Sequence, residues 1–278
     1  MLADRAALTG AAHSPMKTVV YQSYRTHDVP RWVTRCMQSV TQWARVQQFE
    51  YRFIDDRLFD YVPPWYRQAA GANIQVITNL ARLAVARELL AEGYERTIWV
   101  DADIVVFDTS AFRVEITHDF AFCYEVWLTL EAGETHKQSA VNNSVSVFVR
   151  GNAFLDFCIW AHEDLVRRGT QILAHGTSTR LLSALYTTVP FPLLTNVGML
   201  SPAVAQDMRD GSVRLAQEYA ALHARPIHAI NLCGSMCGKL LDGRVLDDGD
   251  YDMLVGAMLA SRGTMFRREV VTPGVSPG

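Results

Sequence analysis

Hydrophobic residues along the chain follow two kinds of pattern, one typical of strands and one typical of helices, and segments of the two kinds alternate. Short apolar or alternating runs are typical of strands, and apolar residues three or four positions apart are typical of helices. Strands are expected at 17–21, 49–53, 97–100, 120–124 and 145–149. The run at 49–53 alternates aromatic and charged residues and is followed by Asp55 and Asp56, as expected for a strand that ends in a polar loop.

Helices are predicted between several of these strands. One carries an apolar stripe from Trp32 to Trp43, and another begins near Asn79 and ends at Gly93, which favours a C-terminal cap. A third passes through 154–165. This alternation of strands and helices predicts an α/β fold with a mostly parallel sheet and helices on both faces.

The folded part of the chain is expected to span 17–267 as a single domain. The sequence has 278 residues, which is enough for a large core, and it shows neither an internal repeat nor a linker rich in Pro, Gly or Ser. Residues 1–16 and 268–278 have no sustained period, so we expect flexible ends there.

Composition and charge exclude several classes of protein. The formal net charge is -3, from 26 basic and 29 acidic residues, so no nucleic-acid partner is expected. No apolar run reaches the ~18 residues of a membrane helix, so no integral membrane segment is expected. The cysteines lack disulfide spacing and favour a cytoplasmic location; they are Cys36, Cys123, Cys158, Cys233 and Cys237. The composition does not indicate an oligomeric state.

Two carboxylates stand directly after the apolar strand at 97–100. Asp101 and Asp103 flank Ala102, and they can converge on one ion where the strand breaks into a loop. Oxygen ligands of this kind select Mg²⁺ or Mn²⁺, and the carboxyl ends of strands are where α/β sheets bind ligands. The alternative is a turn in which Asp101 caps the backbone and Asp103 is solvated.

An ordered set of segments resembles the GT-A glycosyltransferases over roughly residues 17–240. The set comprises a helix with Asn79 and Arg82, the Asp-Ala-Asp triplet at 101–103, and the segments 141–149, 190–196 and 228–235. The similarity is greatest to the retaining families around glycogenin and the galactosyltransferase LgtC, and to the DXD sugar-binding region of mannosyltransferases. Two features depart from the family: 176–182 carries no carboxylate, and Cys237-Gly238-Lys239-Leu240 replaces a Lys-Pro-Trp.

The resemblance implies transfer of a hexose from a nucleotide diphosphate sugar, most simply a UDP-sugar, to a carbohydrate or other hydroxyl acceptor. It implies retention of anomeric configuration and dependence on Mn²⁺ or Mg²⁺. Asp103 and His228 would then bind the metal, with Asp101 on the metal or on the donor. A divalent ion would stabilise the leaving diphosphate as the anomeric bond breaks.

Further residues are expected around the donor. The ends of the first two strands, the face of the helix at 79–92, and turn-forming or small residues later in the chain would contact it. These donor-binding candidates are Tyr21, Gln22, Ser23, Asp55, Asn79, Arg82, Asn142, Asn196, Gly234, Ser235 and Lys239. Asn143 joins Asp101 and Asp103 as a catalytic candidate. Glu125, with Trp127 nearby, is expected at the acceptor side, where it would orient the acceptor or assist its deprotonation.

Other interpretations remain open. An Asp-x-Asp at a strand end also occurs in haloacid-dehalogenase-like phosphatases, and Lys239 with Gly249-Asp250-Tyr251-Asp252 could supply their later motifs. In those enzymes the motif normally opens the domain, whereas here two strand–helix units precede it. A non-catalytic sugar-nucleotide-binding protein on the same fold is a second alternative. Zinc at Cys233, Cys237 and His228 lacks a fourth ligand.

Overall fold

A computed structural model describes residues 16–169, 177–241 and 244–267. Its strands are β1 (Thr18–Ser23), β2 (Glu50–Ile54), β3 (Arg96–Val100), β4 (Ile104–Val106), β5 (Phe120–Glu131), β6 (Glu134–Val149), β7 (Leu193–Leu194), β8 (Val197–Met199), β9 (Ala229–Asn231), β10 (Leu240–Leu241) and β11 (Arg244–Val245). Its helices are α1 (Arg31–Val46), α2 (Pro64–Ala70), α3 (Ile74–Ala91), α4 (Ala153–Arg167), α5 (Thr179–Thr188), α6 (Pro202–Arg209), α7 (Arg214–Ala221) and α8 (Asp248–Ser261), with short 3-10 turns η1 (Asp56–Tyr61), η2 (Gly234–Met236) and η3 (Thr264–Phe266).

A central six-stranded sheet has the order β2-β1-β3-β6-β5-β7. β1 is parallel to β2 and β3, and β5 is parallel to β7, whereas β6 is antiparallel to both of its neighbours. Every strand of this sheet except β6 therefore runs in the same direction, and the predicted mostly parallel α/β architecture is confirmed. A second sheet, with the order β4-β9-β8, begins just after β3 ends.

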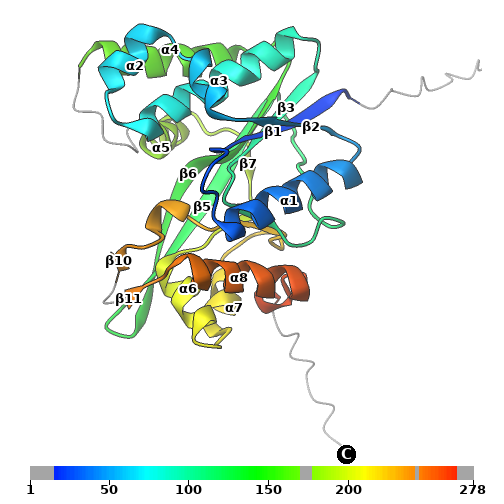
Figure 1. The fold of residues 1–278 in the computed structure, drawn as a ribbon, viewed down its shortest axis with the longest axis vertical. Coiled ribbons are helices and arrows are strands. Elements are labelled where there is room, and N and C mark those ends of the chain that lie inside the picture. Colours follow the sequence, from blue (N-terminus) through cyan, green and yellow to red (C-terminus); the bar gives the residue numbers. More distant parts are fainter. Residues whose placement is uncertain (1–15, 170–176, 242–243, 268–278) are drawn as a thin grey trace, which may run out of the picture.

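Helices cover both faces of the central sheet, as the sequence pattern predicts. Successive residues of β1 point in opposite directions: Val19 and Tyr21 belong to a cluster that includes residues of α3 and α4, and Val20 packs with residues of α1. Figure 1 shows α2, α3 and α4 grouped at one end of the molecule and α6, α7 and α8 at the other. A further cluster joins α1 to α8 and the second sheet.

The helix expected at 79–92 begins earlier, at Ile74, because the Asn73 side chain caps it by accepting a bond from the Val76 amide at 3.3 Å. Gly93 follows the helix with a φ of +109°, a conformation that favours glycine. The expected boundary was therefore correct at the C-terminal end and five residues late at the N-terminal end.

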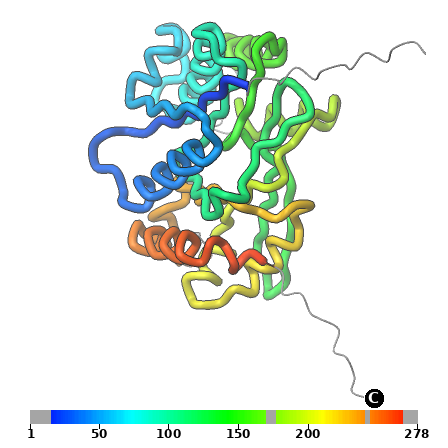
Figure 2. Tube along the Cα trace, turned by 90° about the vertical axis from the view of Figure 1, so that its right-hand side faces the viewer, coloured from blue at the N-terminus to red at the C-terminus, as the bar shows by residue number. Residues whose placement is uncertain are grey.

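The strands expected at 120–124 and 145–149 are parts of a much longer hairpin. β5 and β6 continue to a two-residue turn at Ala132 and Gly133, which both have positive φ, as tight hairpins require. Figure 2 shows this hairpin, in green, extending through much of the height of the molecule. The outer part of β5 keeps an alternating pattern through buried Val126 and Leu128, but residues 134–139 of β6 are polar and mostly exposed, so that strand has no apolar pattern that would predict it.

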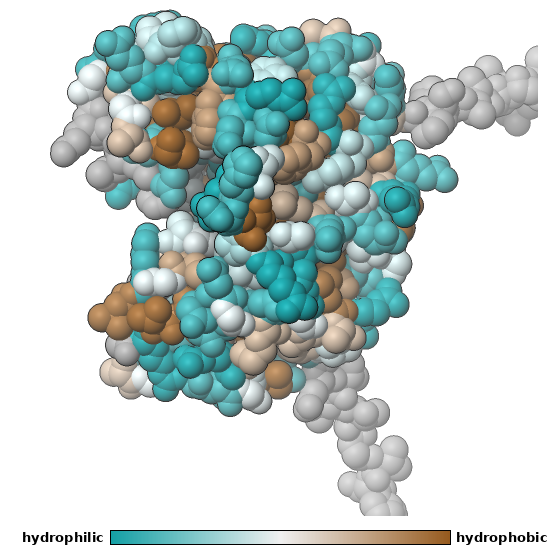
Figure 3. All heavy atoms as spheres, viewed as in Figure 1, coloured by the Kyte–Doolittle hydropathy of each residue, from teal (hydrophilic) through white to brown (hydrophobic). Residues whose placement is uncertain are grey.

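The described surface gives no sign of a large apolar interaction face on the side shown in Figure 3, where hydrophobic residues form small separate areas among polar ones. Within the described ranges, no helix is both long and apolar enough to cross a bilayer. Apart from Met16, the ends expected to be flexible, 1–16 and 268–278, lie outside the described residues.

The buried His162 on α4 makes fold stability depend on pH. Burial lowers the pKa of its imidazole to about 4, although Nδ1 bonds the carbonyl of Cys158, and the positive charge of Arg82 lowers it further. Because this folded pKa lies below the unfolded value, the contribution is complete above about pH 6.5 and is lost as the pH falls toward 4. Through His162, the wild type should lose about 2 kcal/mol of its free energy of unfolding between pH 7.5 and pH 5. In urea titrations, His162→Gln should remove this part of the pH dependence. An unchanged pH dependence in the variant would contradict this prediction.

Candidate active site

A cavity of about 540 Å³ opens at the carboxyl end of β3. Its walls come from α3, from the β5–β6 hairpin, from the start of α5 and from the loop after β9. Of the predicted site residues, the structure places eight on this cavity: Asn79, Arg82, Asp101, Asp103, Glu125, Asn142, Asn143 and Ser235. Segments far apart in sequence therefore converge where the strand-end rule expects a ligand.

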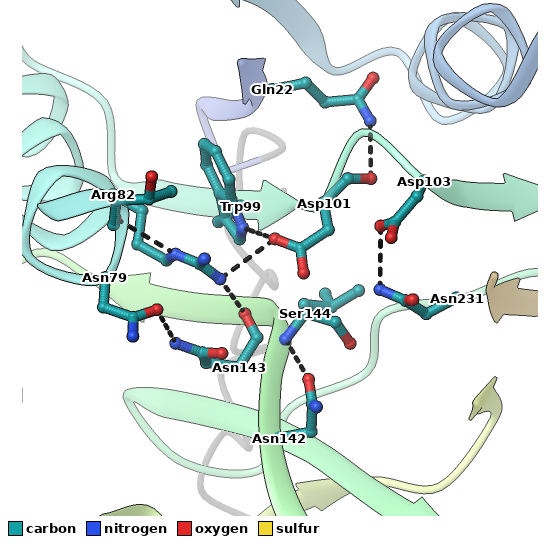
Figure 4. Close-up of polar contacts among 12 residues, drawn as sticks. Gln22, Asn79, Arg82, Trp99, Asp101, Asp103, Asn142, Asn143, Ser144 and Asn231 are labelled. Carbon is teal, nitrogen blue, oxygen red and sulfur yellow. Dashed lines mark hydrogen bonds and ion pairs between the residues drawn. The ribbon is translucent and has the colours of Figure 1, made fainter. Parts of the chain in front are cut away.

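Asp101 is held by a guanidinium and an indole (Figure 4). Its Oδ1 accepts bonds from Nη1 of Arg82 at 3.1 Å and from Nε1 of Trp99 at 2.6 Å. The Arg82 guanidinium also lies over the Trp99 ring, 5.0 Å from its centroid. Burial raises the pKa of Asp101, and the charge of Arg82 opposes that rise. The ion pair and the indole therefore fix the direction of this carboxylate.

Asp103 is held by two N–H donors from the far end of the chain. Nδ2 of Asn231 donates to Oδ1 at 3.1 Å, and the backbone amide of Gly234 donates to Oδ2 at 2.8 Å. Asn231 is itself oriented, because its Oδ1 accepts from the Cys233 amide at 2.6 Å. Burial and the neighbouring charge of Asp101 raise the pKa of Asp103 to about 6. Asn231 carries no separate role in the sequence prediction, yet it lies in direct contact with the carboxylate.

An irregularity in β6 brings the asparagines into the cavity. Phe122 pairs with Ser146, but Cys123 pairs with Asn142, so residues 143–145 bulge out of the ladder. The bulge offers its Asn143 carbonyl to Arg82 at 3.0 Å and its Ser144 carbonyl to the Asp101 amide at 2.8 Å. β-Bulges of this kind redirect side chains at the rims of sites. Here the bulge connects the sheet to both members of the ion pair.

Neutral amides and one further carboxylate complete the inner wall. Nδ2 of Asn143 donates to Oδ1 of Asn79 at 3.3 Å, and Nδ2 of Asn142 donates to Oε2 of Glu125 at 2.8 Å. Asn142 is fixed from the other side, since its Oδ1 accepts from the Ser144 amide at 2.6 Å. The carboxylate of Glu125 therefore has a defined place beside the bulge.

Four predicted donor contacts lie behind the cavity or outside it. Tyr21 is fully buried and donates to the Arg82 carbonyl at 2.7 Å, and buried Gln22 donates to the Asp101 carbonyl at 3.1 Å. Ser23 bonds the carbonyl of Asp55, whose side chain caps η1 and pairs with Arg57. None of the four borders the cavity, so Tyr21 and Gln22 support the site from the rear instead of facing a ligand.

His228 does not lie near the carboxylate pair, and this expectation is corrected. The His228 carbonyl accepts the Phe107 amide at one end of β4, whereas Asp103 precedes the other end and bonds the Leu232 amide through its carbonyl. The imidazole borders a separate cavity of about 380 Å³ beside Arg262. The histidine was placed at the wrong end of β9, three residues before the Asn231 that contacts Asp103.

Three other predicted donor contacts also differ from expectation. Asn196 is buried and donates to the Arg113 carbonyl at 2.7 Å, away from the cavity. Lys239 is exposed and does not border it. Gly234 takes part through its amide on Asp103, and its lack of a side chain matters, because a Cβ there would lie 2.9 Å from the Trp32 ring.

The carboxylate pair fits a hard divalent cation. Among the described residues, Oδ2 of Asp101 accepts no hydrogen bond, and each oxygen of Asp103 accepts one and so keeps a lone pair. The described part of the chain contains no group of three or more His, Cys, Asp or Glu side chains able to hold a metal. Two carboxylates would leave the other coordination positions of a bound metal to water and ligand oxygens. This arrangement suits Mg²⁺ or Mn²⁺ and does not suit zinc.

No protein-family model and no curated protein sequence matches this chain. Three solved structures overlap it loosely. A glycosyltransferase "involved in the glycosylation of the major capsid of PBCV-1" has 8% identity and a TM-score of 0.47, over 87% of this chain and 100% of that chain. "PaToxG Glycosyltransferase" has 14% identity and a TM-score of 0.32, over 63% and 70%. The glycosyltransferase GlyE of Streptococcus pneumoniae TIGR4 has 10% identity and a TM-score of 0.40, over 89% and 64%. At these scores the likeness assigns no role to any residue.

The Arg82–Asp101 pair should contribute strongly to stability because both side chains are largely removed from solvent, at 8% and 24% exposure. Arg82→Met leaves Asp101 and Asp103 without their neighbouring cation, so we expect a loss of about 3 kcal/mol in the free energy of unfolding. The double variant Arg82→Met with Asp101→Asn should recover part of that loss. Arg87→Met, an exposed position on the same helix, is the matched control. Equal small losses at Arg82 and Arg87 in denaturant titrations would show that the ion pair is not stabilising.

Proposed function

We propose that this chain is a glycosyltransferase that moves a hexose from a nucleotide diphosphate sugar to a hydroxyl acceptor with the help of Mn²⁺ or Mg²⁺. The observation that carries the proposal is the cavity at the end of β3, where Asp101 and Asp103 line one wall together with a cluster of asparagines. The carboxylates suit a divalent ion, and the neutral amides beside them suit sugar hydroxyls. Together they fit a sugar diphosphate better than they fit a diphosphate alone or a sugar alone. We assign the function to one domain spanning 17–267.

The charge of the cavity supports dependence on a metal. Asp101, Asp103 and Glu125 face Arg82 and Arg180 around it, which leaves one net negative charge. A diphosphate would be repelled by such a cavity unless a cation accompanied it. Burial, and then the neighbouring charge of Asp101, raise the pKa of Asp103, and a bound divalent ion would favour the charged form of both carboxylates.

Asp101 and Asp103 would hold the ion, which would supply a Lewis acid for the diphosphate leaving group. The chain itself supplies orientation. Asn231 and Gly234 fix the direction of Asp103, and the ion pair with Arg82 fixes that of Asp101. Donors held in place before the substrate arrives need no reorganisation during the reaction.

Polar side chains farther along the wall would position the sugars. The linked amides of Asn79 and Asn143 present neutral donors and acceptors to hydroxyl groups of the donor sugar. Glu125, held by Asn142, would take the proton of the acceptor hydroxyl as its oxygen bonds to the anomeric carbon and the bond to the diphosphate breaks. Retention requires this attack on the face from which the diphosphate leaves. The UDP form of the donor and retention of configuration remain the outcomes that the family resemblance implies.

The phosphatase alternative is less well supported. Its later acidic motif would come from 249–252, but Asp250 pairs with Arg209 and Asp252 pairs with Arg35. Neither aspartate borders the cavity, and Lys239 does not border it either. A non-catalytic protein that binds a sugar nucleotide would share the same donor contacts, so turnover distinguishes it from the enzyme.

Thermal-shift measurements test the donor site. Because a ligand that binds the native state raises stability by mass action, we expect a UDP-sugar to raise Tm only when Mn²⁺ is present. GDP- and dTDP-sugars serve as comparisons. Asp103→Asn should abolish this joint shift and still fold, whereas Asp156→Asn on the surface of α4 should behave like the wild type. A full joint shift in Asp103→Asn would show that the metal assignment is wrong.

Replacement of Glu125 tests the proposed proton acceptor. Glu125→Gln keeps the hydrogen bond with Asn142 available but cannot take a proton, so kcat should fall by about 10²-fold or more. An unchanged kcat in the variant would exclude Glu125 as the base.

A further inference from the structure

The outer half of the cavity is built by one face of the β5–β6 hairpin. Val126 and Leu128 are 0% and 2% exposed and pack into the cluster below the hairpin. Because side chains alternate along a strand, Glu125 and Trp127 point to the opposite face, and both border the cavity. Gln138 lies directly across from Trp127 on β6 and borders it as well.

Trp127 lies one step farther from the carboxylate pair than Glu125. Glu125 is connected to the β6 bulge through Asn142, and the bulge contacts Asp101. Two residues along a strand advance by about 7 Å, so Trp127 lies roughly that far beyond Glu125 toward the hairpin tip. A ligand that reaches Glu125 from the carboxylate pair would therefore contact Trp127 with its next part toward the hairpin tip.

The surroundings of Trp127 combine an apolar surface with hydrogen-bonding groups. The indole is only partly buried, and its nitrogen makes no hydrogen bond to any described residue. The flat ring offers an apolar face, while the indole N–H and the amide of Gln138 offer donors and an acceptor at its edge. Opposite Glu125, Ala140 adds no bulk to the wall. A pyranose ring has a matching pair of features, an apolar C–H face and a rim of hydroxyls.

We propose that this outer half is the acceptor subsite and that it takes a pyranoside, with Trp127 as the stacking surface and Gln138 as a hydrogen-bonding partner. This inference rests on the proposed glycosyltransferase function. It narrows the acceptor from any hydroxyl compound to a saccharide, since a peptide hydroxyl would not need the ring face and an alkyl chain would not need Gln138.

Direct binding tests the subsite without a donor. Maltose, lactose, cellobiose and methyl α-mannoside are the probes, and saturation-transfer NMR detects contact between protein and saccharide. We expect at least one probe to bind the wild type, Trp127→Ala to weaken its Kd by tenfold or more, and Trp127→Phe to weaken it less. Trp160→Ala, at a 54% exposed position on α4, is the matched control. Binding unaffected by Trp127→Ala, or no binding of any probe, would overturn the subsite.

Turnover separates this inference from the proposed function. With the donor identified by thermal shift, saccharide should increase release of the nucleoside diphosphate above donor hydrolysis, and Trp127→Ala should raise the saccharide KM tenfold or more with little change in kcat. Release stimulated by a serine peptide and not by any saccharide would overturn the acceptor assignment but keep the transferase. Loss of donor affinity in Trp127→Ala would also overturn it. No donor binding by the wild type would instead count against the proposed function.

Discussion

The buried ion pair between Arg82 and Asp101 is the interaction on which the site depends. It joins the middle of α3 to the end of β3, and the same guanidinium holds the carbonyl of Asn143 in the β6 bulge. Tyr21 and Gln22 hold the backbone of the two partners from behind. Helix, parallel strand and antiparallel strand are therefore fixed relative to one another at the point where the cavity begins. Without the positive charge, two carboxylates would repel each other in a poorly solvated place.

Local patterns in the sequence predict those parts of the fold that local physics determines. The strands at 97–100 and 17–21 and the end of the helix at Gly93 follow from apolar runs and backbone preference, and the structure contains all three. The long hairpin was not predicted in full, because residues 134–139 of β6 are polar and mostly exposed, and so carry no apolar pattern. The start of α3 was missed because Asn73 looks like an ordinary turn residue until its cap is seen.

For the site, polar residues at the end of a strand were predicted correctly as cavity residues. The residue that a distant segment contributes to the site was not predicted correctly. Asp101, Asp103, Asn79 and Arg82 lie where the end of β3 and the facing side of α3 place them. His228 and Asn231 differ by three positions on one short stretch, and only the register of β9 against β4 decides which of them reaches Asp103. Tyr21 and Gln22 occupy the correct strand but are covered by helix α3 and the Asp101 backbone, a result of packing that no single segment reveals.

The donors on Asp103 also determine the order in which the site can be completed as the chain is made. Asn231 and Gly234 follow Asp103 by 128 and 131 residues, so the carboxylate leaves the ribosome long before either donor exists. The central sheet can pair as soon as β7 has been synthesised, with Arg82 already in contact with Asp101. Until β9 docks beside β4, Asp103 has to remain hydrated. The nascent protein therefore acquires its architecture first, and its ligand-binding centre matures only when the last third of the chain arrives.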